Sequence, residues 1–394
     1  MARKICVLTS VHPASDVRIF HKECKSLARA GYDVTLVATG EKDSEHDGVM
    51  HRAIPASKGR LQRFLRGSLA VYRKAIQEDA DAYHFHDPEL IPIALLLRLR
   101  GKKVVYDIHE DLPSTISYKP YIPPTLCGPV SSVARRIENF AARRFTGLIT
   151  ASPAIADRFR RLNRNLAVVN NFPRIEEIES GSSAGDRPAG RASRKPALLY
   201  VGMRITRARC AVEMVEAMGL LPESVPASLR LVGNWDSEEL PESLSKLAGW
   251  DRVEFVGQLG RPGVAEELRN AAVGLVILHP EPNYVISQPV KLFEYMCAGL
   301  PVIVSDFPIC REIVNQAGCG ILVDPFNPKE IADAMTYLLT HPEEASEMGR
   351  RGYEVVREKY SWANEEKTLL NFYSELLGND EIPEQSLIRR GQAA

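Results

Sequence analysis

Short apolar runs alternate along the chain with longer segments in which apolar residues recur every three or four positions. Runs such as Ile5–Thr9, Val34–Ala38 and Val104–Ile108 predict buried strands, because they are apolar at nearly every position. The segments Phe20–Ala30 and Leu90–Leu99 predict helices that bury one face. This alternation is typical of a parallel sheet that is covered by helices on both faces.

The alternation stops once, where Ser, Gly, Ala, Arg and Pro dominate and no apolar period remains. We therefore expect an α/β protein with two doubly wound, Rossmann-like domains that face a cleft. The predicted parts are an N-terminal domain at 1–178, a linker or exposed loop at 179–195, a second domain at 196–360, a helix at 361–377 and a loose tail at 378–394.

Composition changes this picture little, but the charge is unevenly distributed. The 394 residues include 50 Lys and Arg and 50 Asp and Glu, so the net charge gives no indication of nucleic acid as a partner. Residues 1–180 nevertheless carry 28 basic and 20 acidic side chains, and the remainder is acidic by the same margin. A basic N-terminal half favours an anionic partner or an anionic membrane surface.

The sequence contains no predicted membrane-spanning segment, but one segment is a candidate for peripheral contact with a membrane surface. No stretch approaches the roughly 20 apolar residues of a spanning helix, and the first residues lack the apolar segment of a signal peptide. The seven cysteines form no CxxC pair, which favours free thiols in a reducing cytoplasm. The segment KGRLQRFLRGSLAVYRK at 58–74 combines six basic residues with large apolar ones and no acid. It favours peripheral contact with the inner membrane face, although a solvated surface helix has the same pattern.

Ligand sites in such sheets lie beyond the carboxyl ends of the strands, so polar residues that follow strands are the candidates. The most informative segment is SQPVKLFEYMCAG, in which Ser287, Lys291 and Glu294 share one helix face. We expect Ser287 or Gln288 to cap this helix and Pro289 to lie in its first turn. Free N–H groups and a lysine there suit phosphates, and a glutamate suits the hydroxyls of a ribose. A solvated Lys–Glu pair is the alternative.

Three further polar clusters follow predicted strands. GMRITRAR has three arginines and no neighbouring acid, which fits either a diphosphate or a solvated basic loop. HFHD and HED match no specific zinc spacing, so groups that hydrogen-bond a polar substrate, or capped structural histidines, are favoured over a metal site. The first strand-to-helix turn lacks the Gly-rich dinucleotide fingerprint, and His12 and Arg18 are its candidates for ligand contact.

These segments together resemble a glycosyltransferase of the GT-B fold, of the family 4 (glycosyl transferases group 1) type. The most specific part is PVKLFEYMCAGLPVIVSDFPICREIV, which is similar to the family's donor-site helix and the strand and turn after it. GMRITRAR is similar to the family's loop with two basic residues five apart, matched by Arg204 and Arg209. DVRIFHKE, YHFHDPELIP and VVYDIHED are similar to loops of the family's first domain. The resemblance implies the GT-B architecture, with C-terminal helices that pack back towards the first domain.

The resemblance also implies an activity. A retaining hexosyltransferase of this type moves a sugar from a nucleotide sugar, most commonly a UDP-sugar, to a hydroxyl of a glycan, lipid-linked or small-molecule acceptor, without a metal or other cofactor. By this likeness Arg204 and Arg209 bind the diphosphate and stabilise the leaving group, Glu294 holds the ribose, and His109 lies beside the donor sugar and the acceptor. The other expected donor-binding residues are Gly257, Asn283, Tyr284, Ser287, Gln288, Pro289, Val290 and Lys291. The expected acceptor-side residues are His12, Arg18, His86, Asp87 and Glu110.

The chain departs from the family pattern in two places. The family often carries two glutamates eight positions apart, but Ile286 occupies the first of these positions, which puts the sugar identity in question. The usual Lys–Gly pair is Arg209–Cys210, in which arginine keeps the charge. Two other functions stay open on the sequence alone: a nucleotide-sugar epimerase of the same architecture, and a non-catalytic nucleotide-sugar-binding protein or a metal-dependent hydrolase built on the histidines.

Overall fold

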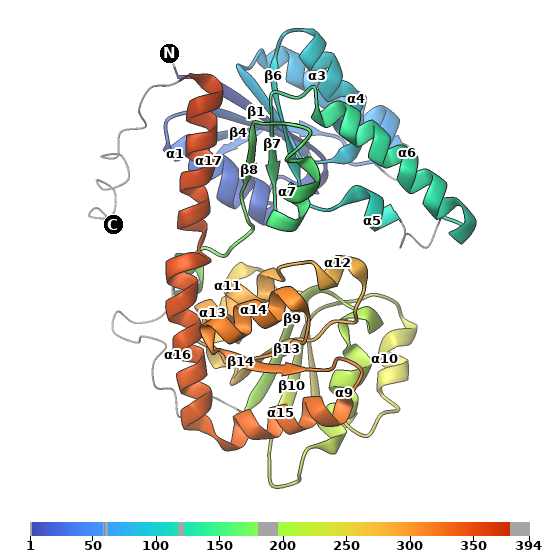
Figure 1. Cartoon of the computed structure of the whole chain (residues 1–394), viewed down its shortest axis with the longest axis vertical. Helices are drawn as coiled ribbons and strands as arrows, with labels where there is room; N and C mark the ends of the chain where they lie inside the picture. Colours follow the sequence, from blue (N-terminus) through green and yellow to red (C-terminus); the bar gives the residue numbers. More distant parts are fainter. Residues whose placement is uncertain (1, 58, 60–61, 117–121, 180–195, 379–394) are drawn as a thin grey trace. The chain divides into compact units, whose positions relative to one another are not determined.

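The computed structural model describes residues 2–57, 59, 62–116, 122–179 and 196–378. The chain divides into two compact units, one formed by Met1–Asn171 with Ala363–Ala394 and the other by Phe172–Trp362. Each unit contains a parallel sheet covered by helices, as the strand–helix alternation predicts (Figure 1). Most of the expected linker at 179–195 and of the expected tail at 378–394 lies outside the described residues, as do positions 58 and 60–61 of the basic segment.

The first unit has an eight-stranded sheet in the order β3-β4-β2-β1-β5-β6-β7-β8, in which only β3 is antiparallel to its neighbour. Its strands are β1 (Lys4–Pro13), β2 (Asp33–Thr39), β3 (Ser44–His46), β4 (Val49–Ile54), β5 (Ala82–Phe85), β6 (Lys103–Ile108), β7 (Gly147–Thr150) and β8 (Leu166–Val168). Its helices include α1 (Lys25–Arg29), α3 (Ser68–Glu78), α4 (Ile91–Leu99), α5 (Leu112–Ile116), α6 (Pro124–Ala142) and α7 (Pro153–Phe159). Strands β5 to β7 are buried over nearly all of their length and β1 over residues 5–10, because helices cover both faces.

The helix after β1 begins with an unusual winding. Asp16 caps it by accepting hydrogen bonds from the backbone N–H groups of Arg18 and Ile19, both at 2.9 Å. The first eight residues, Val17–Cys24, are π-helical, and α1 continues from them. Such windings place side chains differently from an α-helix and are frequent at functional sites. Here the winding turns Arg18, Lys22 and Glu23 inwards, so that all three are buried.

The last helix, α17 (Trp362–Leu377), packs on the sheet of the first unit, as the resemblance implies. The Tyr373 hydroxyl lies 2.9 Å from His84 Nδ1 on β5, and Lys103 Nζ donates to the Leu376 carbonyl at 2.7 Å. Glu365 accepts from the backbone N–H of Asn170 at 2.7 Å. These contacts join residues 195 to 289 positions apart, so the fold of the first unit includes both ends of the described chain.

The second unit has a six-stranded sheet that is parallel throughout, in the order β11-β10-β9-β12-β13-β14. Its strands are β9 (Ala197–Ile205), β10 (Ser228–Trp235), β11 (Val253–Gly257), β12 (Val273–Val276), β13 (Val302–Ser305) and β14 (Gly320–Val323). Its helices are α8 (Ile175–Glu179), α9 (Ala211–Leu220), α10 (Glu239–Leu244), α11 (Arg261–Asn270), α12 (Pro282–Val285), α13 (Val290–Cys297), α14 (Pro308–Ala317), α15 (Pro328–Thr340) and α16 (Pro342–Lys359).

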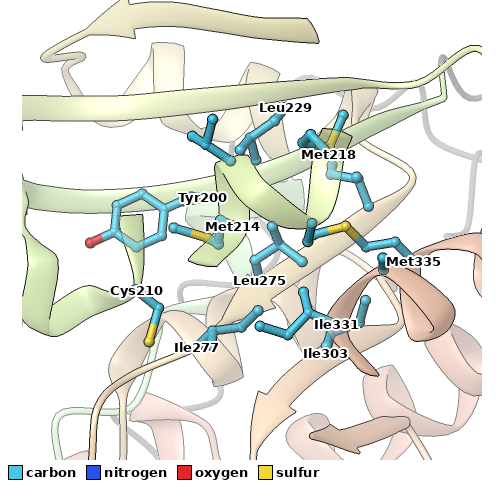
Figure 2. Packing of buried hydrophobic residues seen from close by; sticks show 14 of the residues in the cluster. Tyr200, Cys210, Met214, Met218, Leu229, Leu275, Ile277, Ile303, Ile331 and Met335 are labelled. Atoms are coloured by element: carbon cyan, nitrogen blue, oxygen red, sulfur yellow. The ribbon is translucent and has the colours of Figure 1, made fainter. Parts of the chain in front are cut away.

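Fully buried apolar side chains fill the layer between this sheet and the helices α9 and α15. Figure 2 shows Met214 and Met218 of α9 packed against Leu229, Leu275 and the neighbouring strand residues. Because methionine is flexible and polarisable, it fills irregular gaps between β-branched neighbours. The core fixes the strand ends, and the loops that follow those ends form the candidate site.

Candidate functional site

A pocket of about 370 Å³ lies at the carboxyl ends of strands in the second unit. Val201 and Gly202 of β9, Gln258 and Leu259 after β11, and the start of α13 line it. A larger cavity of about 670 Å³ lies at the opposite edge of the same sheet, where β9 and β10 begin. Its lining is acidic overall, with Arg230 and Arg252 against Asp251, Glu254, Glu266 and Glu267, so it does not suit an anionic ligand. The smaller pocket is the better candidate because of its position and its chemistry.

Two cationic side chains meet in this pocket without a matching anion. The buried ammonium of Lys291 has no hydrogen-bond partner among the described residues, and its Nζ lies 3.7 Å from the centroid of the Tyr200 ring. Arg209 lies close by, with Nε 3.5 Å from the Tyr284 hydroxyl and Nη1 3.4 Å from the Arg204 carbonyl oxygen. Burial and the Arg209 charge hold the pKa of Lys291 well below its ordinary value. Buried cations without counter-charges are costly, so the pocket is prepared for an anion.

The carboxylate of Glu294 lies one helical turn beyond Lys291 and has a different partner. Its Oε1 accepts a hydrogen bond from Arg261 Nη1 at 2.6 Å, and Arg261 Nη2 also contacts Glu177 at 3.1 Å. The sequence analysis did not single out Arg261. Its position in the sequence could have identified it, because Arg261 begins α11 directly after β11. It therefore lies at the same edge of the sheet as the other candidates.

The start of α13 differs from the prediction. Ser287 does not cap the helix, because its hydroxyl donates to the Tyr284 carbonyl at 3.0 Å and closes the preceding turn. The helix begins at Val290, and Pro289 occupies the N-cap position in place of the first turn. No side chain caps the helix, and the buried Gln288 Oε1 has no hydrogen-bond partner. The uncapped backbone N–H groups therefore add to the positive potential of the pocket.

The predicted arginine pair does not share one environment. Arg209 is largely buried at the pocket, whereas Arg204 is 61% exposed and pairs with Asp236 at 2.8 Å. Thr206 caps the short helix between them by accepting from the Arg209 N–H at 3.1 Å. Cys210, where the family has glycine, adopts the left-handed conformation with φ of 53°. The backbone thus keeps a conformation that suits glycine, although the side chain is cysteine.

The remaining predicted donor residues lie around the same pocket with three exceptions, of which Gln288 is the first. Tyr284, Ser287, Pro289 and Val290 line it. Gly257 ends β11 in the left-handed region with φ of 82°, and Asn283 lies in the four-residue helix α12. Neither of these two residues lines the pocket.

A second polar group lies at the carboxyl ends of β1, β5 and β6 in the first unit. His109 Nε2 and His86 Nδ1 both lie near Asp107 Oδ2, at 2.9 and 3.1 Å. His109 is partly exposed, whereas His86 and Asp107 are buried. Asp107 was not predicted as a site residue. It lies within a predicted buried strand, and the sequence pattern does not indicate that its carboxylate contacts His109.

Arg18 has a role other than the predicted ligand contact. Its guanidinium is buried, bridges both oxygens of Asp107 at 2.9 Å, and donates to the Val169 carbonyl at 2.8 Å. Burial alone would raise the pKa of Asp107, but Arg18 and His109 hold it well below its usual range. Because the guanidinium is fully engaged, the structure supports a structural role for Arg18.

His12 and Asp87 form a partly accessible pair at the end of β1. Asp87 is buried and accepts from the Ser10 N–H at 2.7 Å and the Thr9 hydroxyl at 2.8 Å. His12 Nδ1 lies 2.9 Å from Asp16, and its Nε2 lies 3.6 Å from Asp87. Burial alone would lower the pKa of His12, but these carboxylates raise it. The remaining candidate, Glu110, is exposed and accepts from the Thr115 hydroxyl at 3.2 Å.

Beneath these residues lies a buried cluster with the composition of a metal site. Glu23, His84, His86 and Asp107 bring ligand atoms within 4.8 Å of one another. Within the part of the chain that the structure describes, the Glu23 carboxyl group and the Nε2 atoms of His84 and His86 have no hydrogen-bond partner. Arg18 already contacts both carboxylates, at 3.0 Å from Glu23 and 2.9 Å from Asp107. That guanidinium balances the charge of Asp107, while burial and the neighbouring Asp107 raise the pKa of Glu23, which favours a polar structural network.

Comparisons with known proteins place these two units in a family. A model described as glycosyl transferases group 1 matches residues 185–355, and a model described as glycosyltransferase family 4 matches residues 17–175. A phosphatidyl-myo-inositol mannosyltransferase of Mycobacterium leprae is 24% identical over 367 residues, which cover 91% of this chain and 90% of that protein. An uncharacterised glycosyltransferase of Methanocaldococcus jannaschii is 30% identical over 183 residues, which cover 45% of this chain and 44% of that protein.

Solved structures agree on the architecture. Sucrose-phosphate synthase from Thermosynechococcus elongatus superposes with a TM-score of 0.73 at 19% identity, over 96% of this chain and 100% of that chain. Anabaena HepE in complex with UDP and glucose superposes with a TM-score of 0.71 at 14% identity, over 95% of this chain and 100% of that chain. At these identities the likeness establishes the GT-B fold.

Proposed function

Because the chain belongs to the GT-B glycosyltransferases of the group 1 and family 4 type, we propose that it transfers a sugar from a nucleotide-diphosphate sugar to an acceptor hydroxyl with retention of the anomeric configuration. The observation that carries the proposal is the pair of cations Lys291 and Arg209 in the pocket of the second unit. A diphosphate supplies the negative charge that they lack.

The roles of the pocket residues follow from their chemistry. Arg209, the ammonium of Lys291 and the uncapped start of α13 surround the diphosphate. Glu294 accepts hydrogen bonds from the ribose hydroxyls and in doing so exchanges its contact with Arg261 for the ligand. Arg204, which is exposed and paired with Asp236, contributes less than Arg209.

The proposed reaction is a front-side displacement. The bond between the anomeric carbon and the diphosphate oxygen breaks, and a bond to the acceptor oxygen forms on the same face. The acceptor proton passes to an oxygen of the departing diphosphate. The protein stabilises the charge on that leaving group with fixed cations, and this electrostatic contribution is the main catalytic one. His109, held by Asp107, hydrogen-bonds the sugar or the acceptor.

Two features of the relatives support finer parts of the proposal. HepE was solved in complexes with UDP and UDP-glucose, which supports UDP as the nucleotide here. The mycobacterial relative is named for a lipid acceptor, phosphatidyl-myo-inositol, which supports a lipid-linked or glycan acceptor. No helix within the described ranges is long and apolar enough to cross a membrane. We propose a cytoplasmic enzyme. We also propose that it needs no metal ion, because Arg209 and Lys291 supply the positive charge at the leaving group.

The test is turnover of UDP-sugars, followed by NMR so that the anomeric configuration of the product is read directly. We expect an α-linked donor to give an α-linked product, and Arg209→Ala and Glu294→Gln to lose most of the activity. Arg207→Ala is the matched control, because Arg207 is exposed on the same loop and its guanidinium donates to the Ser243 hydroxyl, at 3.0 Å. Donor epimerisation without acceptor would point to an epimerase instead, and an inverted product would overturn the front-side route.

A further inference from the structure

Large exposed apolar side chains concentrate on three helical segments of the first unit. Of the 18 such side chains among the described residues, 11 lie on the π-helical turn Arg63–Gly67 with α3, on α4 and on α6. They are Phe64, Leu65, Leu69, Ile76, Leu96, Leu99, Leu126, Val130, Val133, Ile137 and Phe140. The segments are neighbours, because α4 contacts both α3 and α6 (Figure 1). Single exposed apolar residues are ordinary, but a concentration of this kind marks an interaction surface.

Helix α6 carries the clearest part of this pattern. Leu126, Val130, Val133, Ile137 and Phe140 recur at intervals of three or four residues, so they form one continuous stripe on a helix of 19 residues. Each is between 39% and 54% exposed. The buried positions Glu138, Ala141 and Ala142 pack the helix onto the unit, so its apolar stripe is additional to its packing face. An ordinary surface helix would carry polar residues there.

The same three segments are basic and carry no free acid. They bear Arg63, Arg66, Arg73, Lys74, Arg98, Arg135 and Arg136, and Arg100, Arg143 and Arg144 follow α4 and α6 directly. Their carboxylates are already engaged, since Glu78 pairs with Lys4 and Arg52, and Glu138 pairs with Arg158. Arg66, Arg73, Arg135, Arg136 and Arg143 form no ion pair within the described residues. The apolar stripe is therefore flanked by positive charge that has no partner in the unit.

An apolar stripe flanked by arginines fits some binding partners better than others. A second copy of the chain, related by a two-fold axis, would bring arginines against arginines, and like charges at an interface are repulsive. An anionic lipid bilayer attracts these arginines and also accepts the apolar stripe at the boundary between headgroups and acyl chains. A basic helix with large apolar residues on its other face has the composition of an interfacial helix.

We propose that the face formed by Arg63–Gly67 with α3, α4 and α6 docks on an anionic lipid surface, with the stripe Leu126–Phe140 as its apolar anchor. The sequence pattern indicated this contact in the segment at 58–74 alone, and the exposed apolar residues of α4 and α6 enlarge the proposed surface. The proposal is independent of the sugar-transfer function, because it concerns a different unit from the diphosphate pocket.

The experiment is flotation of the full chain with vesicles of phosphatidylcholine containing phosphatidylglycerol, and with vesicles of phosphatidylcholine alone. We expect binding to the anionic vesicles only, weaker binding at high salt, and a loss of more than about 10-fold for Val133→Asp/Ile137→Asp. The matched control is Leu220→Asp, which removes an equally exposed apolar residue from the second unit and should bind as wild type does.

Two further measurements check that the double variant is folded and still binds UDP. UDP binding and the thermal midpoint should be unchanged in Val133→Asp/Ile137→Asp, because both positions are exposed and lie outside the donor pocket. Equal binding of wild type and this variant, or of anionic and neutral vesicles, overturns the proposal. A wild-type dimer in light scattering that the double substitution converts to a monomer would assign the stripe to a second copy and also overturns it.

Discussion

At the residue scale, Lys291 is the position on which the candidate site depends most. Its ammonium is buried, is stacked over Tyr200 and has no hydrogen-bond partner. A residue of this kind destabilises the free protein, so its presence is explained by a ligand and not by stability.

We expect Lys291→Met to stabilise the free protein by roughly 1–3 kcal/mol, because methionine has similar volume and leaves no buried charge. Urea unfolding followed by the fluorescence of the three tryptophans measures this directly, since Trp235, Trp250 and Trp362 all lie in the second unit. A destabilised variant would mean that the ammonium has a partner in the free protein, which would contradict the interpretation of the pocket.

Cys210 carries a second residue-scale prediction. Its φ of 53° favours glycine, and its side chain is buried in the core of the second unit. Cys210→Gly and Cys210→Ala lose the same sulfur contacts, but only alanine keeps a Cβ in the left-handed conformation. We expect the glycine variant to be more stable than the alanine variant by about 1 kcal/mol in the same unfolding assay. The reverse order would mean that the loop relaxes and that the conformation is not imposed.

Sequence patterns predicted the residues of the site better than their contacts. Lys291, Glu294 and Arg209 could be selected because charge follows a strand or opens a helix. Asp107 and Arg261 could not be assigned roles, because their importance depends on partners that lie far away in the sequence, Arg18 and Glu294 respectively. The burial of Arg18 and its contacts with Asp107 escaped prediction for the same reason, since nothing local indicates that an arginine after β1 is buried.

At the element scale, apolar runs predicted most strands of the two sheets, but a strand without apolar residues was not predicted. The strand β3 (Ser44–His46) contains only Ser, Glu and His, and it forms the antiparallel edge of its sheet. Edge strands need no apolar run, because one side of them is solvated. The cap of α13 was predicted at the wrong residue, because Ser287 completes the turn of α12 and its hydroxyl is not left for capping.

The packing of α17 on β5 gives an element-scale prediction about pH. His84 is fully buried, contacts Tyr373, and faces Glu23, His86 and Asp107. Burial and the neighbouring His86 hold the pKa of His84 well below its ordinary value. The folded His84 therefore stays neutral while the unfolded chain takes up a proton near pH 6.5, so stability falls as the pH drops through that value.

We expect the free energy of unfolding of the first unit to fall between pH 7.5 and pH 5.5 by about 1 kcal/mol more in the wild type than in His84→Gln. The comparison isolates His84, because the raised pKa of Glu23 contributes an opposite slope to both proteins. Circular dichroism measures the transition, and tryptophan fluorescence reports the second unit as an internal control. Identical pH profiles for the two proteins would contradict a neutral His84.

At the scale of the whole molecule, both doubly wound units were predicted from strand–helix alternation alone. The membership of the last helix in the first unit was implied only by the resemblance, since no local pattern links Tyr373 to His84. The charge asymmetry between the two halves was visible in composition. The location of the positive charge on α3, α4 and α6 could not be predicted from composition, because it depends on which faces of those helices stay exposed.

The proposed absence of a metal requirement is tested on the whole enzyme. We expect turnover to be unchanged when EDTA replaces added Mg²⁺ or Mn²⁺, because Arg209 and Lys291 supply the charge that a metal ion supplies elsewhere. Activity that disappears in EDTA and returns with a divalent cation would show that the two side chains do not suffice.

The central claim is that the cationic pocket of the second unit binds the diphosphate of the donor. Calorimetric titration with UDP and with uridine, in EDTA, tests it most directly. We predict one UDP site whose affinity falls about 10- to 100-fold in Lys291→Met and in Arg209→Ala, while Arg207→Ala binds as wild type does and the weak binding of uridine is unchanged. Equal affinity of the wild type and Lys291→Met for UDP would contradict the account.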